Sequence, residues 1–191
     1  MYIMPSLCLH EDTKILCFVD SKETYLPIKT LTAGMLVVTS SGNKKIDLIG
    51  SVTAINVHMH PAVMEKLYIC KKEKYPELTE DLILTGTHSI LVDALTEEQR
   101  QRTIQLTNEV YMTDTKYRLI AAIDSRAEIY PMSGTFTVWN MSLEDKSDTS
   151  LEDKSDTSLE DKSDTKNYGI YANGLLVETA SKRSMQVMLR V

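Results

Sequence analysis

The sequence lacks long hydrophobic runs, an even set of cysteines and a basic excess. No run approaches the roughly 18 apolar residues of a membrane helix, so we expect no membrane span. Residues 1–9 contain no Lys or Arg and include Pro5, which disfavours a signal peptide. Three cysteines imply no closed disulfide framework and favour a reducing, intracellular compartment. Stability must then come from the packing of a hydrophobic core. A chain of 191 residues is long enough to bury such a core in a single domain.

The net charge of −6 comes from one segment. Residues 142–165 repeat Ser-Leu-Glu-Asp-Lys-Ser-Asp-Thr three times and hold nine acids and three lysines. The rest of the chain keeps 18 acids and 18 bases, so its overall charge gives no argument for nucleic-acid binding, and no Lys/Arg cluster suggests a local site. Each copy has one Leu and no aromatic residue, too little to offset the entropy of ordering. We interpret the repeat as a solvated loop inserted between two strands. We prefer the interpretation that the repeat has no function over the interpretation that it binds a partner.

Most of the remaining segments predict β-strands, separated by turn residues every 8–12 positions. They are residues 13–19, 24–28, 35–39, 45–58 (one bent strand, or two joined near Gly50), 66–71, 82–84, 89–92, 117–123, 135–141, 168–171, 175–178 and 185–191. Residues 96–106 predict one short helix capped by Thr96. Asn173-Gly174 between apolar runs predicts a hairpin turn. The pattern predicts an all-β domain.

Cys8, Thr85 and His88 are the candidate chemical groups. A cysteine nucleophile needs a partner that polarises the bond it attacks or handles its proton. Taken singly, a lone cysteine is more often a small buried hydrophobe, which is also our interpretation of Cys17. A lone Thr-x-x-His means little by itself.

The surrounding pattern resembles Hint domains, the module shared by hedgehog proteins and inteins. Residues 8–15 (Cys-Leu-His-Glu-Asp-Thr-Lys-Ile) resemble the block that opens such domains, and residues 27–38 resemble the "I-x-x-L-x-x-G-D-x-V" segment. Thr85-x-x-His88 resembles the second block, and residues 168–177 resemble the closing hairpin. The four segments occur in the family's order and spacing.

The resemblance implies an all-β horseshoe with pseudo-twofold symmetry. Residues 8–181 would form the Hint domain, with the acidic insert at 142–165. Residues 1–7 would be an extein-like remnant flank, and residues 182–191 a C-terminal strand or tail.

The resemblance also implies a reaction at the Leu7–Cys8 peptide. The Cys8 side chain would attack the Leu7 carbonyl and convert the peptide into a thioester, open to water or a thiol. Thr85 and His88 would hydrogen-bond the scissile amide, and His88 would protonate the leaving nitrogen. An amide resists attack because resonance stabilises it, so the site must distort or polarise the bond.

The chain departs from splicing inteins at its closing hairpin, where the family ends in His-Asn. Glu178 and Thr179 stand at about those positions, and threonine has no amide nitrogen to cyclise. We therefore expect N-terminal cleavage without splicing, and we place Asn173, Gly174, Glu178 and Thr179 near the site. Met35 replaces the Asp of the "G-D" pair, at little expected cost. Too few residues follow the hairpin for a sterol region.

Two alternatives stay open beside autocleavage. A degenerate Hint fold would no longer cut and would serve as a structural or interaction module. His58, His60 and Cys70 could form a metal site, but surface histidines are the preferred interpretation. His10 follows Cys8 closely and is more simply a neighbour of the site. We expect no metal or cofactor, no nucleic acid or membrane partner, a monomer, and the protein's own N-terminal flank as substrate. A bacterial or large-virus origin fits the Glu-Thr ending, again by resemblance.

Overall fold

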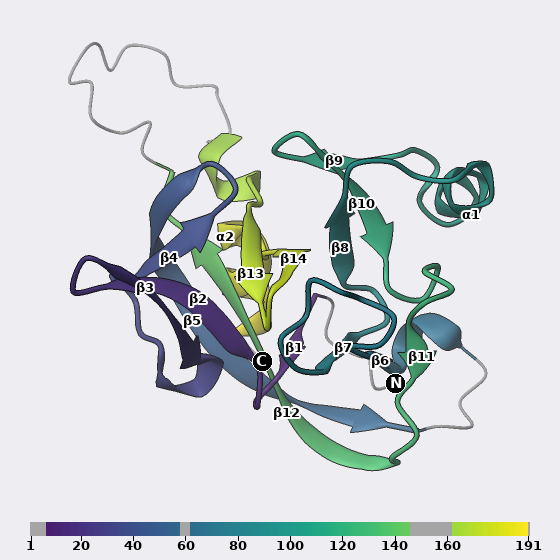
Figure 1. Cartoon of the computed structure of the whole chain (residues 1–191), viewed down its shortest axis with the longest axis horizontal. Coiled ribbons are helices and arrows are strands. Elements are labelled where there is room, and N and C mark those ends of the chain that lie inside the picture. The colour runs from purple at the N-terminus through teal and green to yellow at the C-terminus, as the bar shows by residue number, and fades with distance from the viewer. Residues whose placement is uncertain (1–6, 58–61, 146–161, 191) are drawn as a thin grey trace.

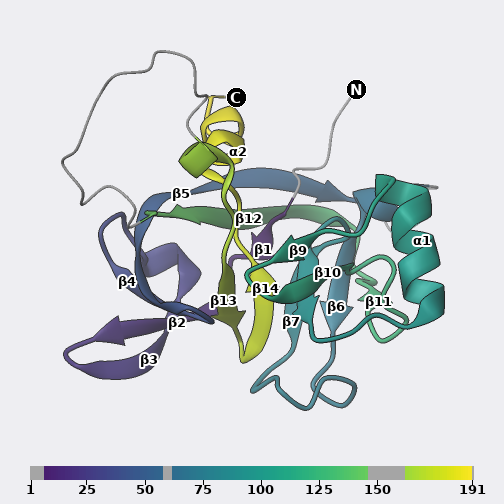
Figure 2. The same cartoon turned by 90° about the horizontal axis from the view of Figure 1, so that it is seen from above.

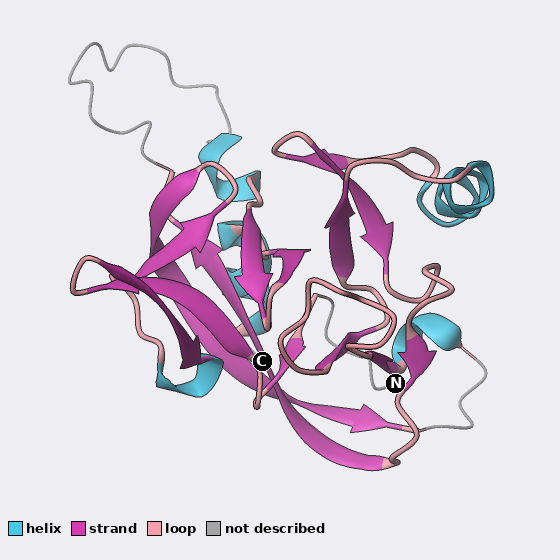
Figure 3. Ribbon diagram, viewed as in Figure 1, coloured by secondary structure: helices cyan, strands magenta, loops and turns pink. Residues whose placement is uncertain are grey.

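The computed structural model describes residues 7–57, 62–145 and 162–190. Its strands are β1 (Leu9–His10), β2 (Lys14–Val19), β3 (Lys22–Pro27), β4 (Leu36–Thr39), β5 (Gly42–Asn56), β6 (Leu67–Cys70), β7 (Leu82–Thr85), β8 (Ser89–Val92), β9 (Met112–Thr113), β10 (Lys116–Ile120), β11 (Glu128–Ile129), β12 (Gly134–Leu143), β13 (Gly169–Ala172) and β14 (Leu175–Glu178). The α-helices are α1 (Glu97–Thr107) and α2 (Lys182–Met188). The prediction of an all-β fold is confirmed (Figures 1 and 3).

The paired strands form one continuous path in the order β11-β6-β7-β1-β12-β5-β4-β2-β13-β14-β8-β10-β9, and β3 adds to β2. All of the pairings are antiparallel. β5 is one long strand, which decides between the two alternatives for residues 45–58, and it pairs with β12 almost throughout. β1 lies between β7 and β12, because Leu9 pairs with both Leu84 and Trp139. This central position carries Cys8 into the interior.

Strand alternation gives the long β5–β12 pair two different faces. The pairs Gly50–Asn140, Val52–Val138 and Ala54–Phe136 follow one another at every second residue, so their side chains share one face. Cys8, Ala54, Leu67 and Val138 form a small apolar cluster there, apart from the main core. Figure 2 shows α2 on one side of the β5 and β12 ribbons.

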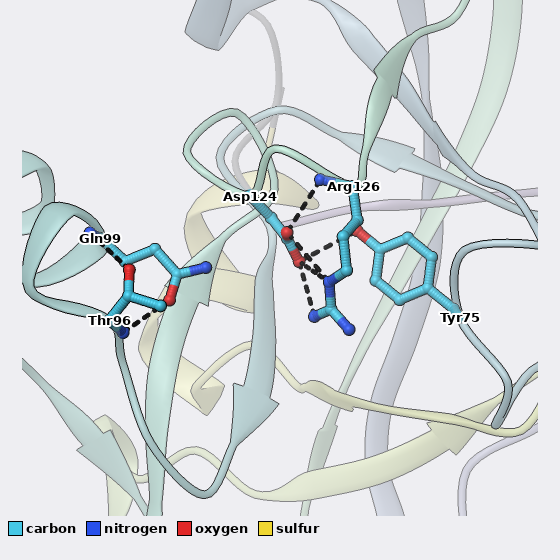
Figure 4. A network of polar contacts seen from close by, with 5 residues as sticks. All are labelled: Tyr75, Thr96, Gln99, Asp124 and Arg126. Atoms are coloured by element: carbon cyan, nitrogen blue, oxygen red, sulfur yellow. Dashed lines mark hydrogen bonds and ion pairs between the residues drawn. The ribbon is translucent and has the colours of Figure 1, made fainter.

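Three short 3₁₀ turns complete the described chain: Ile28–Thr30, Val63–Glu65 and Lys162–Thr165. Within the described ranges, neither α-helix has the length and apolar content needed to cross a membrane. The predicted helix at 96–106 is confirmed as α1. Thr96 and Gln99 exchange side chain and backbone hydrogen bonds in a capping box at its start (Figure 4).

A buried polar network braces the loop after β6. The Tyr75 hydroxyl donates to Asp124 Oδ2 at 3.0 Å, and Arg126 Nη2 donates to the same oxygen at 2.8 Å (Figure 4). The Arg126 guanidinium also lies over the Tyr75 ring, 4.4 Å from its centroid. Because the Asp124 charge is paired and hydrogen-bonded, it is tolerated inside the fold. The loop held in this way contacts the closing hairpin.

The prediction of a strand at 185–191 is wrong, because residues 182–188 form α2. Ser181 caps the helix by accepting a hydrogen bond from Ser184 N–H. Met185, Met188 and Leu189 are spaced by three and four residues, which places them on one face of a helix. In a strand the same spacing would have divided them between two faces.

The insertion also begins later than predicted. Ser142 and Leu143 belong to the first repeat, but both are buried at the end of β12. Asp145 and Lys166 form an ion pair at 3.2 Å, which brings the two ends of the insertion together. Residues 146–161, together with His58 and His60, lie outside the described residues.

Candidate active site

Thr85 and His88 face the Cys8 peptide because a tight turn joins β7 to β8. The His88 N–H donates to the Thr85 carbonyl at 2.9 Å, which closes a β-turn over residues 85–88. The spacing Thr-x-x-His therefore places two side chains at the two ends of one turn. Both side chains are fully buried.

Thr85 hydrogen-bonds both the N–H and the carbonyl of Cys8. Cys8 N–H donates to Thr85 Oγ1 at 2.9 Å, and Thr85 N–H donates to the Cys8 carbonyl at 2.9 Å. The Thr85 hydroxyl also donates to the Cys8 carbonyl at 3.4 Å. The structure therefore places Thr85 in direct contact with the Cys8 backbone. The backbone orientation of Cys8 depends directly on this threonine.

His88 lies between the opening and closing segments of the chain. Burial lowers the pKa of His88 to about 4, while the nearby backbone of Cys8 and Glu178 acts in the opposite direction. Neither ring nitrogen makes a hydrogen bond of standard geometry with a described residue. At neutral pH the ring is consequently neutral.

Asn140, a residue of β12, hydrogen-bonds the Leu7 carbonyl. Its Oδ1 accepts from Met141 N–H at 2.7 Å and from Ala180 N–H at 3.2 Å. These two donors fix the orientation of the side-chain amide, and Nδ2 donates to the Leu7 carbonyl oxygen. A donor at this position stabilises negative charge that develops on the oxygen during attack.

Asn140 was not predicted as a site residue from the sequence. A signal was available: a polar residue stands between Trp139 and Met141 in a strand that is otherwise apolar at this point. Its partner could not be known, because Leu7 lies 133 positions away.

Leu7 has an unusual backbone conformation. Its φ is 60°, in the left-handed region. The other described residues with positive φ are glycines or short polar residues, Asp20, Ser21, Asn108, Asp114 and Asn173. Those side chains tolerate the left-handed region, whereas an aliphatic side chain adopts it at a cost. The Thr87 hydroxyl accepts from Leu7 N–H at 3.4 Å, so Leu7 is held at both its N–H and its carbonyl.

Burial raises the pKa of the Cys8 thiol to about 12. The residue is fully buried, and its Sγ lies 3.9 Å from Met188 Sδ of α2. A thiol in this state is protonated at neutral pH and is a weak nucleophile. Cys17 and Cys70 are also buried thiols, as was predicted for Cys17.

The closing hairpin reaches the site at one end. The Glu178 backbone lies beside His88, but its carboxylate points into a separate pair with Arg118, Nε to Oε1 at 2.6 Å. Burial raises the pKa of Glu178. The Thr179 hydroxyl is fully buried and accepts from Tyr168 N–H at 3.0 Å.

Asn173 and Gly174 form the turn at the other end of this hairpin, both with positive φ, and Asn173 bonds Lys14 and Asp81. The described contacts of the turn therefore lead away from Cys8. His10 also contacts other groups: its ring lies 5.8 Å from that of Phe136, and its Nδ1 accepts from Asp12 N–H at 3.3 Å. In the described part of the chain, no three His, Cys, Asp or Glu side chains group as a metal site.

Neither a protein-family model nor a curated protein matches the chain. Its similarity is to solved intein structures. A triple-substituted form of the gp41-1 intein is 9% identical, with a TM-score of 0.43, over 89% of this chain and 97% of that chain. The unsubstituted gp41-1 intein is 12% identical (TM-score 0.42; 89% and 96% covered). A DnaB intein from Synechocystis sp. PCC 6803 is 11% identical (TM-score 0.42; 91% and 98% covered). These likenesses are distant.

Proposed function

We propose that the chain is a Hint-type autoprocessing domain that cleaves itself before Cys8. The observation that carries the proposal is the set of hydrogen bonds that holds the Leu7–Cys8 peptide, together with the backbone conformation of Leu7. Asn140 donates to its carbonyl oxygen and Thr85 accepts from its N–H, while Leu7 stands in a left-handed conformation. Polarisation and strain are the two means by which an amide is made reactive.

The proposed reaction is an N-to-S acyl shift. Cys8 Sγ bonds to the Leu7 carbonyl carbon, and the bond between that carbon and the Cys8 nitrogen breaks. The thiol proton passes to the neutral His88 ring and then to the leaving nitrogen, which becomes the α-amine of Cys8. The product is a thioester between Leu7 and the Cys8 sulfur. Attack by an external thiol then releases the flank as a new thioester and restores the Cys8 thiol.

Splicing is not part of the proposal. Thr179 offers no amide nitrogen for cyclisation, and its hydroxyl is already used by Tyr168 N–H. Glu178 stands where splicing inteins have histidine, and its carboxylate is occupied by Arg118. The expected products are therefore a released N-terminal flank and an intact remainder.

The second candidate is a degenerate Hint fold that binds or supports without cutting. The complete burial of the Cys8 thiol favours it, because burial holds the thiol protonated. A fusion with a folded reporter upstream of Met1 separates the two candidates. Release with dithiothreitol or hydroxylamine that disappears in Cys8→Ala supports autocleavage. An intact fusion over many hours in both proteins supports the degenerate fold.

Asn140→Asp tests the polarising contact. The new carboxyl keeps an oxygen for Met141 and Ala180 N–H, but when ionised it cannot donate to the Leu7 carbonyl. We expect cleavage to fall by about 10²- to 10³-fold at pH 8. We expect partial recovery toward pH 5, where a protonated carboxyl donates again. Unchanged cleavage at pH 8 would show that Asn140 does not polarise the bond.

A further inference from the structure

α2 covers the site, although the proposed reaction does not use it. The helix starts three residues after Thr179, and Met185 is fully buried against the body of the protein. Lys182 and Asp47 form an ion pair at 3.4 Å near its start. Figures 1 and 2 both place α2 beside β12.

The end of α2 closes over the nucleophile. Met188 packs into the small apolar cluster of Cys8, Ala54, Leu67 and Val138, with Sδ 3.9 Å from Cys8 Sγ. Its neighbour Leu189 fills the space above Gly50, where an added Cβ would lie 2.3 Å from Leu189 Cδ2. Because Gly50 has no side chain, the end of α2 has room at this position. Gly50 pairs with Asn140 of β12, so the helix end lies beside Asn140.

α2 has little stability of its own. Seven residues are too few for a helix that is stable by itself, so packing must maintain it. Its first turn contains Lys182 and Arg183 and no acid, the unfavourable sign for a helix N-terminus. Val187 points outward with 63% of its surface exposed. A segment of this kind opens more readily than the sheet beneath it.

We propose that Met188, carried by α2, decides which nucleophiles reach the Cys8 thioester. With α2 packed, external thiols and water are excluded from the bond between the Leu7 carbonyl and Cys8 Sγ. When α2 moves away, a thiol attacks that carbonyl, takes over the acyl group and leaves the Cys8 thiol free. The control of cleavage rests on the proposed function, whereas the shielding of the thiol does not.

The first experiment measures alkylation of the thiols by iodoacetamide, followed by peptide mass spectrometry. Met188→Ala removes the side chain over Cys8, and Gly50→Val displaces Leu189 with a residue that suits a strand. Val187→Ala is the matched control, since it truncates the exposed side of the same helix. We expect Cys8 alkylation to rise at least tenfold in the first two variants and to stay unchanged in the control.

Cys17 and Cys70 report on global opening in the same samples, because both are buried in the main core away from α2. The proposal that Met188 protects the Cys8 thiol is overturned if Cys8 reacts at the same rate in all proteins. It is also overturned if Cys17 and Cys70 accelerate in parallel with Cys8, because Met188 would then support the whole fold only.

The second experiment measures dithiothreitol-dependent release of the upstream reporter. Faster release in Met188→Ala than in Val187→Ala supports the proposal. Release at equal rates in both would sink it while leaving autocleavage intact. If Cys8 is alkylated faster in Met188→Ala but no protein releases the reporter, autocleavage is excluded. The protection of the Cys8 thiol by Met188 is then still supported.

Discussion

Leu7 gives the clearest residue-scale prediction, because substitutions can separate the strain of its left-handed backbone from the effect of its side chain. A left-handed residue with a Cβ costs about 1–2 kcal/mol, and glycine does not pay this cost. If breaking the bond relieves the strain, Leu7→Gly loses that contribution and cleaves about 5- to 30-fold more slowly. Leu7→Ala keeps the Cβ and should cleave at the parent rate. Reporter release measures both rates, and equal rates for Gly and Ala would exclude a role for backbone strain.

His88 predicts a pH dependence of stability. Its pKa is about 4 when folded, against 6.5 for a ring exposed to water, as in the unfolded chain. Between these pH values the unfolded chain binds a proton that the folded chain does not, so stability falls as pH is lowered. Over the whole window the loss is on the order of 3 kcal/mol. Urea unfolding at pH 7 and pH 4.5 measures it, and His88→Gln should show a smaller loss.

Glu178 acts with the opposite sign in that experiment. Its raised pKa lets the folded state keep a proton at higher pH than the unfolded state does, which favours folding as pH falls. The carboxyl is present in both proteins, so its effect cancels in the comparison with His88→Gln. Identical pH profiles for the two proteins would contradict the low pKa of His88.

The residues of the site were predictable only where the chain itself sets their spacing. A four-residue turn fixes Thr85 and His88, and the motif order fixes Cys8. Asn140 and Met188 come to Leu7 and Cys8 from 133 and 180 positions away, through sheet register and helix packing. Sequence periodicity carries no information about such distances.

At the scale of elements, the closing hairpin depends on Gly174. Its φ is 102°, and an added Cβ would lie 2.2 Å from the Glu77 carbonyl oxygen, a backbone atom. Gly174→Ala should therefore cost on the order of 2 kcal/mol or more. Gly34 has a φ of 86° with open space around it, so Gly34→Ala should cost about 1 kcal/mol. Urea unfolding compares the two, and equal costs would show that the loop carrying Glu77 gives way.

Long elements were predicted well and short ones poorly. Alternation and turn residues identified β2, β5, β12 and β14, and the capping residue identified α1. β1, β9 and β11 have two residues each and were not predicted, because two residues carry no period. The sequence of α2 fits a strand as well as a helix, because seven residues from a mixed apolar run are compatible with either period. Only the cap at Ser181 favours the helix.

At the scale of the whole molecule, charge and fold are separate. The segment that carries the net charge leaves the sheet after Leu143 and returns before β13. The rest of the chain is neutral, and the groups of the site are held by burial and hydrogen bonds. Acidic charge is consequently not expected to steer the reaction.

Deleting two of the three repeats tests this separation. The deletion keeps one copy, with Ser142 and Leu143 still closing β12, and moves the net charge from −6 to −2. The Asp145–Lys166 ion pair already brings the ends of the insertion together, so the shortened loop spans them without strain. Closing a shorter loop favours folding by about 1 kcal/mol at most. We therefore expect an unchanged or slightly higher melting temperature and an unchanged rate of reporter release. A large fall in melting temperature would show that the repeat packs against the domain, and its interpretation as a solvated insertion would then be wrong.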